Sequence, residues 1–490
     1  MTNHVLSHRS AGVLLHPTSL PGVAGNGDLG AEAYHFVDFL ADSGFTLWQT
    51  LPLGPTHGDL SPYQCQSVNA GSYKLINLQL LAEHGWLADP SLNNSMDIDL
   101  QRRQKLREAF AVFMQSAVDE KRSEFEAFKR QHQNWLDDFS LYQALRGEHQ
   151  NKAWFDWPVA LRDRQLAAMD KARKTLSAEI EQANFEQFVF YQQWLALRQY
   201  ANDKGVRLFG DIPIFVAHDS SDVWAHPELF TIDEAGALIV VAGVPPDYFS
   251  ETGQRWGNPL YNWENHAQDN YAWWVDRIKN QIELFDLLRI DHFRGFEAAW
   301  EISADEETAM NGEWVKGPGK AFFERLRQVF GELPLVAEDL GVITDEVNAL
   351  RQAFDLPGMK ILQFAFDGSS DNPYLPHNHE SLSVVYTGTH DNNTTRGWWA
   401  ELTEQEQHRI RQYFGHPADE PHWLLMRAAF ASVANLAVVP MQDILGLGGE
   451  DRMNIPGVAD HNWLWRFDWS SVSADHSRQC RDMIHTYGRN

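Results

Sequence analysis

The sequence predicts an α/β protein built as a (β/α)8 TIM barrel, and two observations carry this prediction. Eight short apolar runs, several of them rich in β-branched residues, alternate with helical stretches along the 490 residues. Such alternation produces a parallel sheet, and eight strands close it into a barrel. Acidic residues directly follow several of these runs, and barrel enzymes place their active sites at the carboxyl ends of the strands.

The predicted strands are bounded by turn residues and span 12–16, 46–51, 206–210, 285–289, 334–337, 359–364, 383–386 and 435–439. Amphipathic helices are predicted between the later strands, for example at 320–329 and 404–413. Thr403, with Glu406 three residues later, has the pattern of a capping box at the start of the second of these helices.

Two long stretches interrupt the alternation within what we expect to be a single catalytic barrel over 1–490. Residues 75–203, between the second and third strands, have mainly helical patterns and predict a helical insertion subdomain. Residues 219–272 are rich in Gly, Pro, Asn and Trp. They predict a loop-rich insertion after the third strand that covers the active-site mouth.

The net charge of −27 argues against nucleic acid as a partner, because phosphate binding requires a basic surface. It also disfavours an anionic membrane, whereas a neutral substrate, a cation or simply an acidic surface is compatible. No apolar run approaches the roughly 20 residues of a membrane span, and residues 1–12 lack a signal-peptide pattern. With two cysteines, Cys65 and Cys480, both expected as reduced thiols, we expect a cytoplasmic protein.

Charged residues stand at the ends of four predicted strands. They are Asp211 after the third strand, Arg289 and Asp291 at the end of the fourth, Glu338 after the fifth, and His390 and Asp391 after the seventh. A single Asp at a strand end is more often the N-cap of the next helix. Four such ends around one barrel mouth instead indicate a site with several carboxylates.

Clustered carboxylates serve either a metal site or the cleavage of a glycosidic bond. Arg289 lies two residues before Asp291, so both side chains point to the same side of the strand. A guanidinium in that place orients a carboxylate for nucleophilic attack, whereas it would oppose the charge balance of a cation site. Glu338 follows an apolar strand, where low solvation favours a general acid. The sequence therefore favours glycosidic chemistry.

The motifs at these strand ends resemble those of one enzyme family. They are Gly210-Asp-Ile-Pro-Ile-Phe-Val216, Arg289-Ile-Asp-His-Phe-Arg-Gly-Phe296, Ala337-Glu-Asp-Leu-Gly341 and Gly388-Thr-His-Asp-Asn392, with further matches at 61–64, 244–259, 440–448 and 452–457. Together they are similar to the conserved regions of the 4-α-glucanotransferases, or amylomaltases, of glycoside hydrolase family 77 in the α-amylase clan. The resemblance extends from Gly12 to Trp469.

This resemblance implies a role for each matching residue. Asp291 would be the nucleophile that forms a covalent glucosyl–enzyme intermediate, Glu338 the acid and base, and Asp391 the third catalytic carboxylate, bonded to the sugar hydroxyls. The implied substrate-binding residues are Tyr63, Asp211, Arg289 and His390 around the cleaved sugar, Asp247, Gln254 and Trp256 in a loop over the acceptor side, and, as weaker candidates, Asp367 and Asn462. The resemblance implies no cofactor. No metal ligands are assigned, and the sequence leaves open whether a structural calcium is bound.

The resemblance also implies the substrates, which would be maltooligosaccharides and starch or glycogen chains. The carboxylates are common to transfer and hydrolysis, so the alternative is a retaining α-amylase-type hydrolase. Transfer requires that water be excluded while a sugar hydroxyl is held for attack, and residues 245–259 are the expected acceptor clamp. A catalytically inactive glucan-binding protein is disfavoured because all three carboxylates are present. The sequence leaves open the preferred chain length and whether the protein is a monomer or a homodimer.

Overall fold

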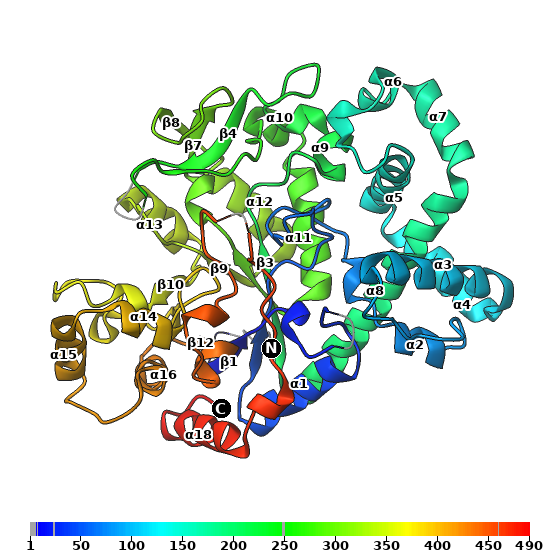
Figure 1. The fold of residues 1–490 in the computed structure, drawn as a ribbon. Coiled ribbons are helices and arrows are strands. Elements are labelled where there is room, and N and C mark those ends of the chain that lie inside the picture. Colours follow the sequence, from blue (N-terminus) through cyan, green and yellow to red (C-terminus); the bar gives the residue numbers. More distant parts are fainter. Residues whose placement is uncertain (1–5, 7, 23–24, 247–249, 459) are drawn as a thin grey trace.

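The computed structural model describes every residue except 1–5, 7, 23–24, 247–249 and 459. An eight-stranded parallel sheet forms its centre, in the order β10-β11-β12-β1-β2-β3-β6-β9 (Figure 1). The strands are β1 (Ser10–Leu14), β2 (Leu47–Gln49), β3 (Arg207–Ile212), β6 (Leu287–Ile290), β9 (Leu335–Ala337), β10 (Gly358–Ile361), β11 (Ser383–Tyr386) and β12 (Leu436–Pro440). The Ala337 N–H donates to the Pro357 carbonyl at 2.9 Å, between the two edge strands. The predicted (β/α)8 barrel is confirmed.

All eight predicted strands are present, with ends that differ from the prediction by no more than three residues. The largest difference lies at the sixth barrel strand, where β10 ends at Ile361 and residues Leu362–Phe364 form a 3-10 turn. The predicted strand extended to residue 364 because Leu362 and Phe364 are apolar, like the strand residues before them. Local periodicity therefore located the strands but not every end.

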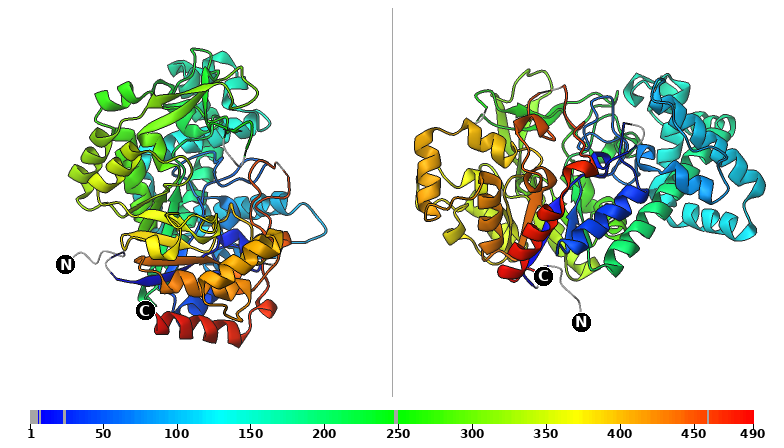
Figure 2. Two further views of the ribbon diagram at one scale, coloured as in Figure 1. Left: turned by 90° about the vertical axis from the view of Figure 1, so that its left-hand side faces the viewer. Right: turned by 60° about the horizontal axis from the view of Figure 1, so that its bottom comes forward.

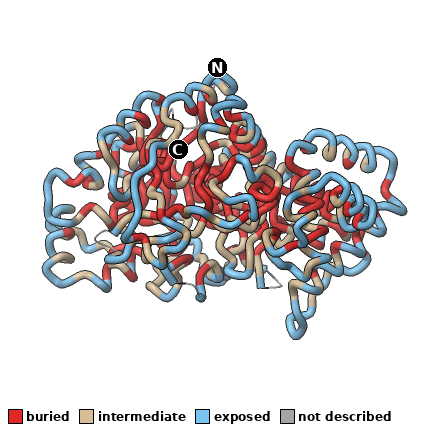
Figure 3. The backbone as a smooth tube through the Cα atoms, turned by 90° about the horizontal axis from the view of Figure 1, so that it is seen from above, coloured by how far each residue is buried: buried red, intermediate tan, exposed pale blue. Residues whose placement is uncertain are grey.

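The barrel strands are buried on both faces, which explains their near-continuous apolar sequences. One cluster of buried side chains takes residues from all eight strands and fills the interior: Leu14, Leu47, Phe209, Leu287, Val336, Met359, Ile361, Val384, Tyr386, Leu436 and Val438. A second and larger cluster packs the outer strand faces against the helices. Figure 3 shows the buried backbone gathered at the centre and the exposed backbone around it.

The helices around the barrel follow the strands in chain order. They are α1 (Ala31–Asp42), α8 (Ser177–Asp203), α11 (Ala272–Leu284), α12 (Lys320–Phe330), α13 (Asp345–Ala353), α14 (Thr395–Glu401), α15 (Glu404–Tyr413), α16 (Pro421–Ala431), α17 (Met441–Ile444) and α18 (Ala474–Thr486). The helices predicted at 320–329 and 404–413 correspond to α12 and α15. The capping box of Thr403 and Glu406 is present at the start of α15.

A group of helices between β2 and β3 extends from one side of the barrel (Figures 1 and 2). It contains α2 (Leu78–Glu83), α3 (Ile98–Ser116), α4 (Asp119–Gln131), α5 (Gln133–Glu148), α6 (Val159–Arg162) and α7 (Leu166–Thr175). The long helix α8 joins this group to β3. Among the described residues, no helix is long and apolar enough to cross a membrane.

Four further strands form a second, antiparallel sheet, separate from the barrel sheet, in the order β5-β4-β7-β8. Two strands precede β6, namely β4 (Val240–Val244) and β5 (Gln254–Arg255), and two follow it, namely β7 (Ala298–Ser303) and β8 (Gly312–Lys316). Two short helices, α9 (Ser221–Ala225) and α10 (Trp263–Gln268), flank β4 and β5 in the chain. The sequence pattern predicted loops at 219–272, because short strands of mixed polarity carry no clear alternation.

Candidate active site

Arg289 links three polar side chains at the ends of neighbouring barrel strands. Its guanidinium donates to Asp211 Oδ2 at 2.6 Å and to Asp291 Oδ1 at 2.7 Å. The Tyr63 hydroxyl donates to the same oxygen of Asp211 at 2.7 Å. The Arg289 side chain is only 5% exposed, whereas that of Asp291 is 28% exposed. Asp291 is therefore oriented from beneath and accessible from the barrel mouth.

Glu338 follows β9 and is held by backbone N–H groups of the loop after β6 and of its own loop. The N–H of His292 donates to its Oε2 at 2.7 Å, and the N–H of Leu340 donates to its Oε1 at 3.0 Å. His292 adopts a left-handed conformation with φ of 49°, which is uncommon for a non-glycine residue. His292 directly follows Asp291 in the chain, and its N–H bonds to Glu338, so this one residue links the two acidic residues.

Burial raises the pKa of Glu338 to about 8, and the nearby carboxylate of Asp291 also raises it. Arg289 and the hydrogen bond from the His292 N–H act in the opposite direction, but burial is the larger influence. Glu338 is therefore protonated at neutral pH and can donate a proton. The two acidic residues thus have different surroundings, one bound to a guanidinium and one desolvated, which is the arrangement that separates an acid from a nucleophile.

The loop after β11 brings His390 and Asp391 to the same site. The His390 ring stacks on the Tyr63 ring, with centroids 5.2 Å apart and an angle of 11° between the planes. His390 Nε2 lies 3.3 Å from Asp391 Oδ2, and Asp391 Oδ1 accepts a hydrogen bond from Asn454 Nδ2 at 2.6 Å. The side chain of Asp391 is 46% exposed. Its carboxylate is therefore fixed on one side and open on the other.

Comparison with known proteins agrees with this geometry. A family model described as 4-alpha-glucanotransferase, glycoside hydrolase family 77, matches residues 15–471. The chain is 50% identical to the 4-alpha-glucanotransferase of Thermus thermophilus, over 97% of this chain and 98% of the relative. It is 42% identical to the chloroplastic/amyloplastic 4-alpha-glucanotransferase of Solanum tuberosum, over 98% and 86% of the two chains.

The chain belongs to glycoside hydrolase family 77. Among solved structures, the amylomaltase of Streptococcus agalactiae in complex with acarbose superposes with a TM-score of 0.94 at 36% identity. The match covers 98% of this chain and 100% of that one. The expected membership in the family 77 4-α-glucanotransferases is confirmed.

In this family 77 chain, the second sheet carries Gln254 and Trp256 toward the catalytic strands. Gln254 lies in β5, and its Oε1 accepts a hydrogen bond from Trp256 Nε1 at 3.2 Å. The Trp256 ring meets the His292 ring edge to face, with centroids 4.9 Å apart. Since His292 follows Asp291 directly, Trp256 stands beside the acidic pair. Asp247, expected in the same loop, lies outside the described residues.

The two weaker substrate-binding candidates make local contacts. Asp367 is exposed on the segment after β10, where it accepts a hydrogen bond from the Ser369 N–H at 2.9 Å. Asn462 is buried, and its amide bonds to the backbone of Ile455 and Val458. Asn462 thus links Ile455 and Val458.

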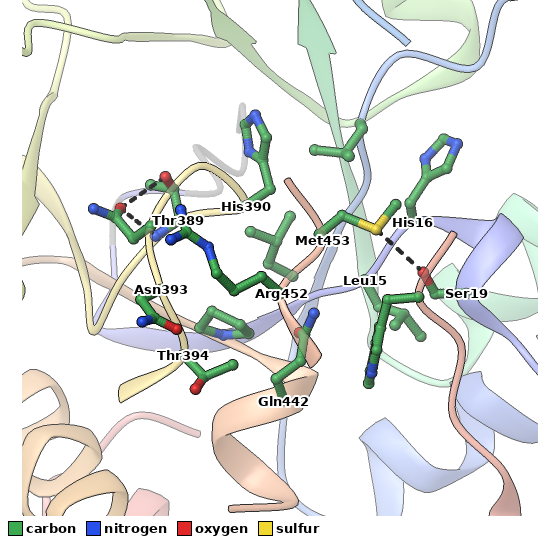
Figure 4. A pocket seen from close by; sticks show the side chains of 15 residues that line it. Leu15, His16, Ser19, Thr389, His390, Asn393, Thr394, Gln442, Arg452 and Met453 are labelled. Atoms are coloured by element: carbon green, nitrogen blue, oxygen red, sulfur yellow. Dashed lines mark hydrogen bonds between the residues drawn. The ribbon is translucent and has the colours of Figure 1, made fainter. Parts of the chain in front are cut away.

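Three residues that sequence reasoning missed support the loop after β11. Asn454 binds the Asp391 carboxylate, Arg452 Nη2 donates to the Asp391 carbonyl at 2.9 Å, and Asp443 lies beneath the loop. Figure 4 shows Arg452 beside Thr389 and Asn393, with Gln442 close by. Asp443 stands just after β12, so the strand-end rule applied to the other strands could have found it.

Proposed function

We propose that this family 77 4-α-glucanotransferase moves α-1,4-linked glucan segments by a retaining double displacement, with Asp291 as nucleophile and Glu338 as acid and base. The observation that carries the proposal is the contrast between the two residues. Asp291 is oriented by Arg289 at 2.7 Å, while burial raises the pKa of Glu338 to about 8. A retaining mechanism requires this pairing of an oriented nucleophile and a protonated acid.

In the first step, a carboxylate oxygen of Asp291 attacks the anomeric carbon, and the glycosidic bond breaks. Glu338 gives its proton to the leaving oxygen, which departs as the 4-hydroxyl of the released glucan. In the second step, the Glu338 carboxylate takes the proton from the 4-hydroxyl of an acceptor. The acceptor oxygen forms the new glycosidic bond at the anomeric carbon, and the bond to Asp291 breaks.

The remaining polar residues would bind the sugar at the cleavage point. Asp391 has one carboxylate face open to the mouth and can accept hydrogen bonds from ring hydroxyls. His390 and Asp211 would grip the same sugar, and the Tyr63 ring offers an apolar face for stacking. Asp367 and Asn462 belong to the proposal as outer contacts.

Transfer is faster than hydrolysis only if the acceptor site excludes water. Trp256 covers His292 beside the nucleophile, and Gln254 fixes the indole through its Nε1. We assign the acceptor site to these two residues together with Asp247. A sugar bound there would be held in attack geometry while water is displaced.

The product pattern from maltotriose tests the activity. Transfer gives a ladder of longer maltooligosaccharides together with free glucose. The Asp291→Asn variant should lose both products by more than about 10³-fold, as expected when a nucleophile is removed, and should still bind acarbose. Products no longer than maltotriose would assign the protein to the α-amylase-type hydrolases instead.

The covalent step can be tested separately with the Glu338→Gln variant and α-maltotriosyl fluoride. Fluoride leaves without help from an acid, whereas the second step lacks its base, so the glycosyl–enzyme should accumulate. Mass spectrometry should find a maltotriosyl group on the peptide that contains Asp291. An unmodified enzyme, or a β-anomeric first product by NMR, would refute the double displacement.

The proposal also includes a cytoplasmic location. Cys65 and Cys480 are free thiols, which suits a reducing compartment. Cell fractionation with an antibody against the protein would test this location.

A further inference from the structure

Asp443 lies beneath the loop that carries His390 and Asp391 and bonds to both ends of it. Its Oδ2 accepts hydrogen bonds from Thr387 Oγ1 at 2.6 Å and from Thr395 Oγ1 at 2.7 Å. Its Oδ1 accepts a bond from the Thr395 N–H at 2.8 Å. Thr387 is the first residue after β11, and Thr395 is the first residue of α14. One carboxylate thus joins the two points at which the loop leaves the barrel and returns to it.

The carboxylate is placed where only these bonds can satisfy it. Asp443 is 1% exposed, and within the described ranges no Lys, Arg or His forms an ion pair with it. Burying a carboxylate without a cation is costly, and hydrogen bonds to hydroxyl and amide groups must compensate. A residue that served only to fill space here would be apolar, so the carboxylate indicates a specific bonding role.

Further hydrogen bonds hold the rest of the loop. Gln363 Nε2 donates to the Asn393 carbonyl at 2.8 Å, and Asn392 Oδ1 accepts bonds from the N–H and hydroxyl of Thr389. Asn454 then holds the Asp391 carboxylate itself. In Figure 4 the labelled loop residues Thr389, His390, Asn393 and Thr394 curve around the pocket. Asp443 closes the base of this loop.

We propose that Asp443 is a positioning residue for Asp391, acting through Thr387 and Thr395 to hold the loop in its working shape. The inference rests on the proposed role of Asp391 in binding the cleaved sugar. Asp443 is 1% exposed and bonds to the two ends of the loop, so it would not touch the sugar itself. A displacement of about 1 Å at a sugar-binding carboxylate can cost about 100-fold in rate, so fixing both loop ends has a direct kinetic effect.

Three variants test the proposal on the maltotriose reaction. Asp443→Ala should lower kcat per folded molecule by about 30-fold to 100-fold and change KM by less than about 3-fold. The reason is that Asp391 would bind the distorted sugar of the transition state more tightly than the undistorted sugar of the bound substrate, so its displacement affects kcat more than KM. Thr387→Val removes one bond without changing shape and should lower kcat by about 5-fold to 10-fold. Thr387→Ser keeps the hydroxyl, so the kcat of this variant should stay within about 2-fold of that of the parent chain.

The matched control is Asp286→Ala. The side chain of Asp286 is only 6% exposed, and it accepts hydrogen bonds from Arg198 Nη2 and the Leu208 N–H, each at 2.8 Å, and a longer one from Asn202. It differs from Asp443 in having a cation, Arg198, as a partner. It precedes β6 at the opposite end of the barrel, where residues serve stability. This variant should unfold more easily but keep kcat within about 3-fold of the parent. An equal loss of kcat in the two Ala variants would overturn the positioning role.

A double-mutant cycle on acarbose affinity separates this inference from the proposed function. Asp443→Ala and Asp391→Asn should each weaken binding, and the double variant should bind no more than about 3-fold more weakly than Asp391→Asn alone. If the loss of acarbose affinity in the double variant equals the product of the two single losses, the two residues act independently, and Asp443 does not act through Asp391. If Asp391→Asn keeps full transfer activity, the role of Asp391 fails; if only Asp443→Ala and Thr387→Val keep it, the positioning inference fails alone.

Discussion

Glu338 and Asp291 both carry carboxyl groups, yet their surroundings make them chemically unlike. Arg289 donates directly to Asp291 at 2.7 Å. Among the described residues, the hydrogen bonds to the Glu338 carboxyl come from backbone N–H groups, and Glu338 is 9% exposed. Desolvation disfavours the charged form of a carboxyl group, so the pKa of Glu338 rises to about 8. Glu338 therefore retains at neutral pH the proton that the proposed mechanism requires, at a cost to the stability of the fold.

That cost predicts a pH-dependent gain in stability for Glu338→Gln. The folded-state pKa of about 8 lies above the ordinary value of 4.5. Between these two pH values the unfolded chain has released the proton and the folded chain has kept it, so the parent loses stability as pH rises. The variant does not titrate, and its advantage in free energy of unfolding should grow on the order of 2 kcal/mol or more from pH 5 to pH 8.

Urea denaturation at pH 5 and pH 8 measures this difference. The control is Glu324→Gln, because Glu324 is exposed on α12. It should give the same small change at both pH values. A stability difference for Glu338→Gln that does not vary with pH would contradict the raised pKa.

The second sheet acts as a unit that delivers Trp256 to the site. The chain leaves the barrel after β3, forms β4 and β5, and returns through α11, and β7 and β8 complete the sheet after β6. The antiparallel pairing of β4 with β7 joins residues about sixty positions apart, such as Val240 with Ser303. Local patterns predicted the eight barrel strands but not these four, because these four are short and carry no clear alternation of polar and apolar residues.

For this element we predict that Trp256→Ala shifts the reaction from transfer toward hydrolysis. Without the indole against His292, water gains access to the intermediate while the acceptor loses a stacking face. The ratio of transfer to hydrolysis on maltotriose should fall by about 10-fold, as measured by free reducing ends against longer products.

The control for this substitution is Trp314→Ala. Trp314 lies in β8 of the same sheet and is 37% exposed. Its removal should leave the ratio within about 2-fold of the parent, as for an exposed residue outside the site. Equal ratios for the parent and Trp256→Ala would show that another part of the mouth excludes water.

At the scale of the whole molecule, Arg489 joins the beginning and end of the chain. Its side chain is fully buried and donates to the Ser10 carbonyl of β1 and to three carbonyls at the end of α16, those of Ala429, Phe430 and Ser432. The Phe430 and Ser432 carbonyls also accept bonds from Arg9 Nη2, at 2.8 and 2.7 Å. Cations at this end of the helix favour the helix dipole. The C-terminal segment thereby anchors the junction of β1, α16 and α18.

Arg489→Met should therefore destabilise the protein without changing its chemistry. Loss of the guanidinium removes four hydrogen bonds to carbonyls, although Phe430 and Ser432 keep their bonds from Arg9, so the expected cost is about 2 kcal/mol or more. The value of kcat should stay within about 2-fold of the parent, because Arg489 bonds to Ser10 at the amino end of β1. Chemical denaturation and maltotriose kinetics measure the two effects.

Arg478→Met is the comparison. Arg478 forms an ion pair with Asp475 in which both side chains are 64% exposed, and such pairs contribute less than about 1 kcal/mol. Similar losses of stability in the two variants would contradict the anchoring role of Arg489.

The sequence by itself determined the barrel and its strand-end residues, because both follow from patterns within a few residues of each other. Alternating apolar runs identify strands locally, and Arg289 with Asp291 share a face through their spacing of two. What the tertiary structure decided is how distant segments meet. The support of Asp391 by Asn454 and Asp443 and the contact of Trp256 with His292 depend on packing between segments far apart in the chain. Low solvation of Glu338 was expected from its place after an apolar strand, and the structure adds the partners that surround it. Contacts between distant segments are not encoded in local periodicity.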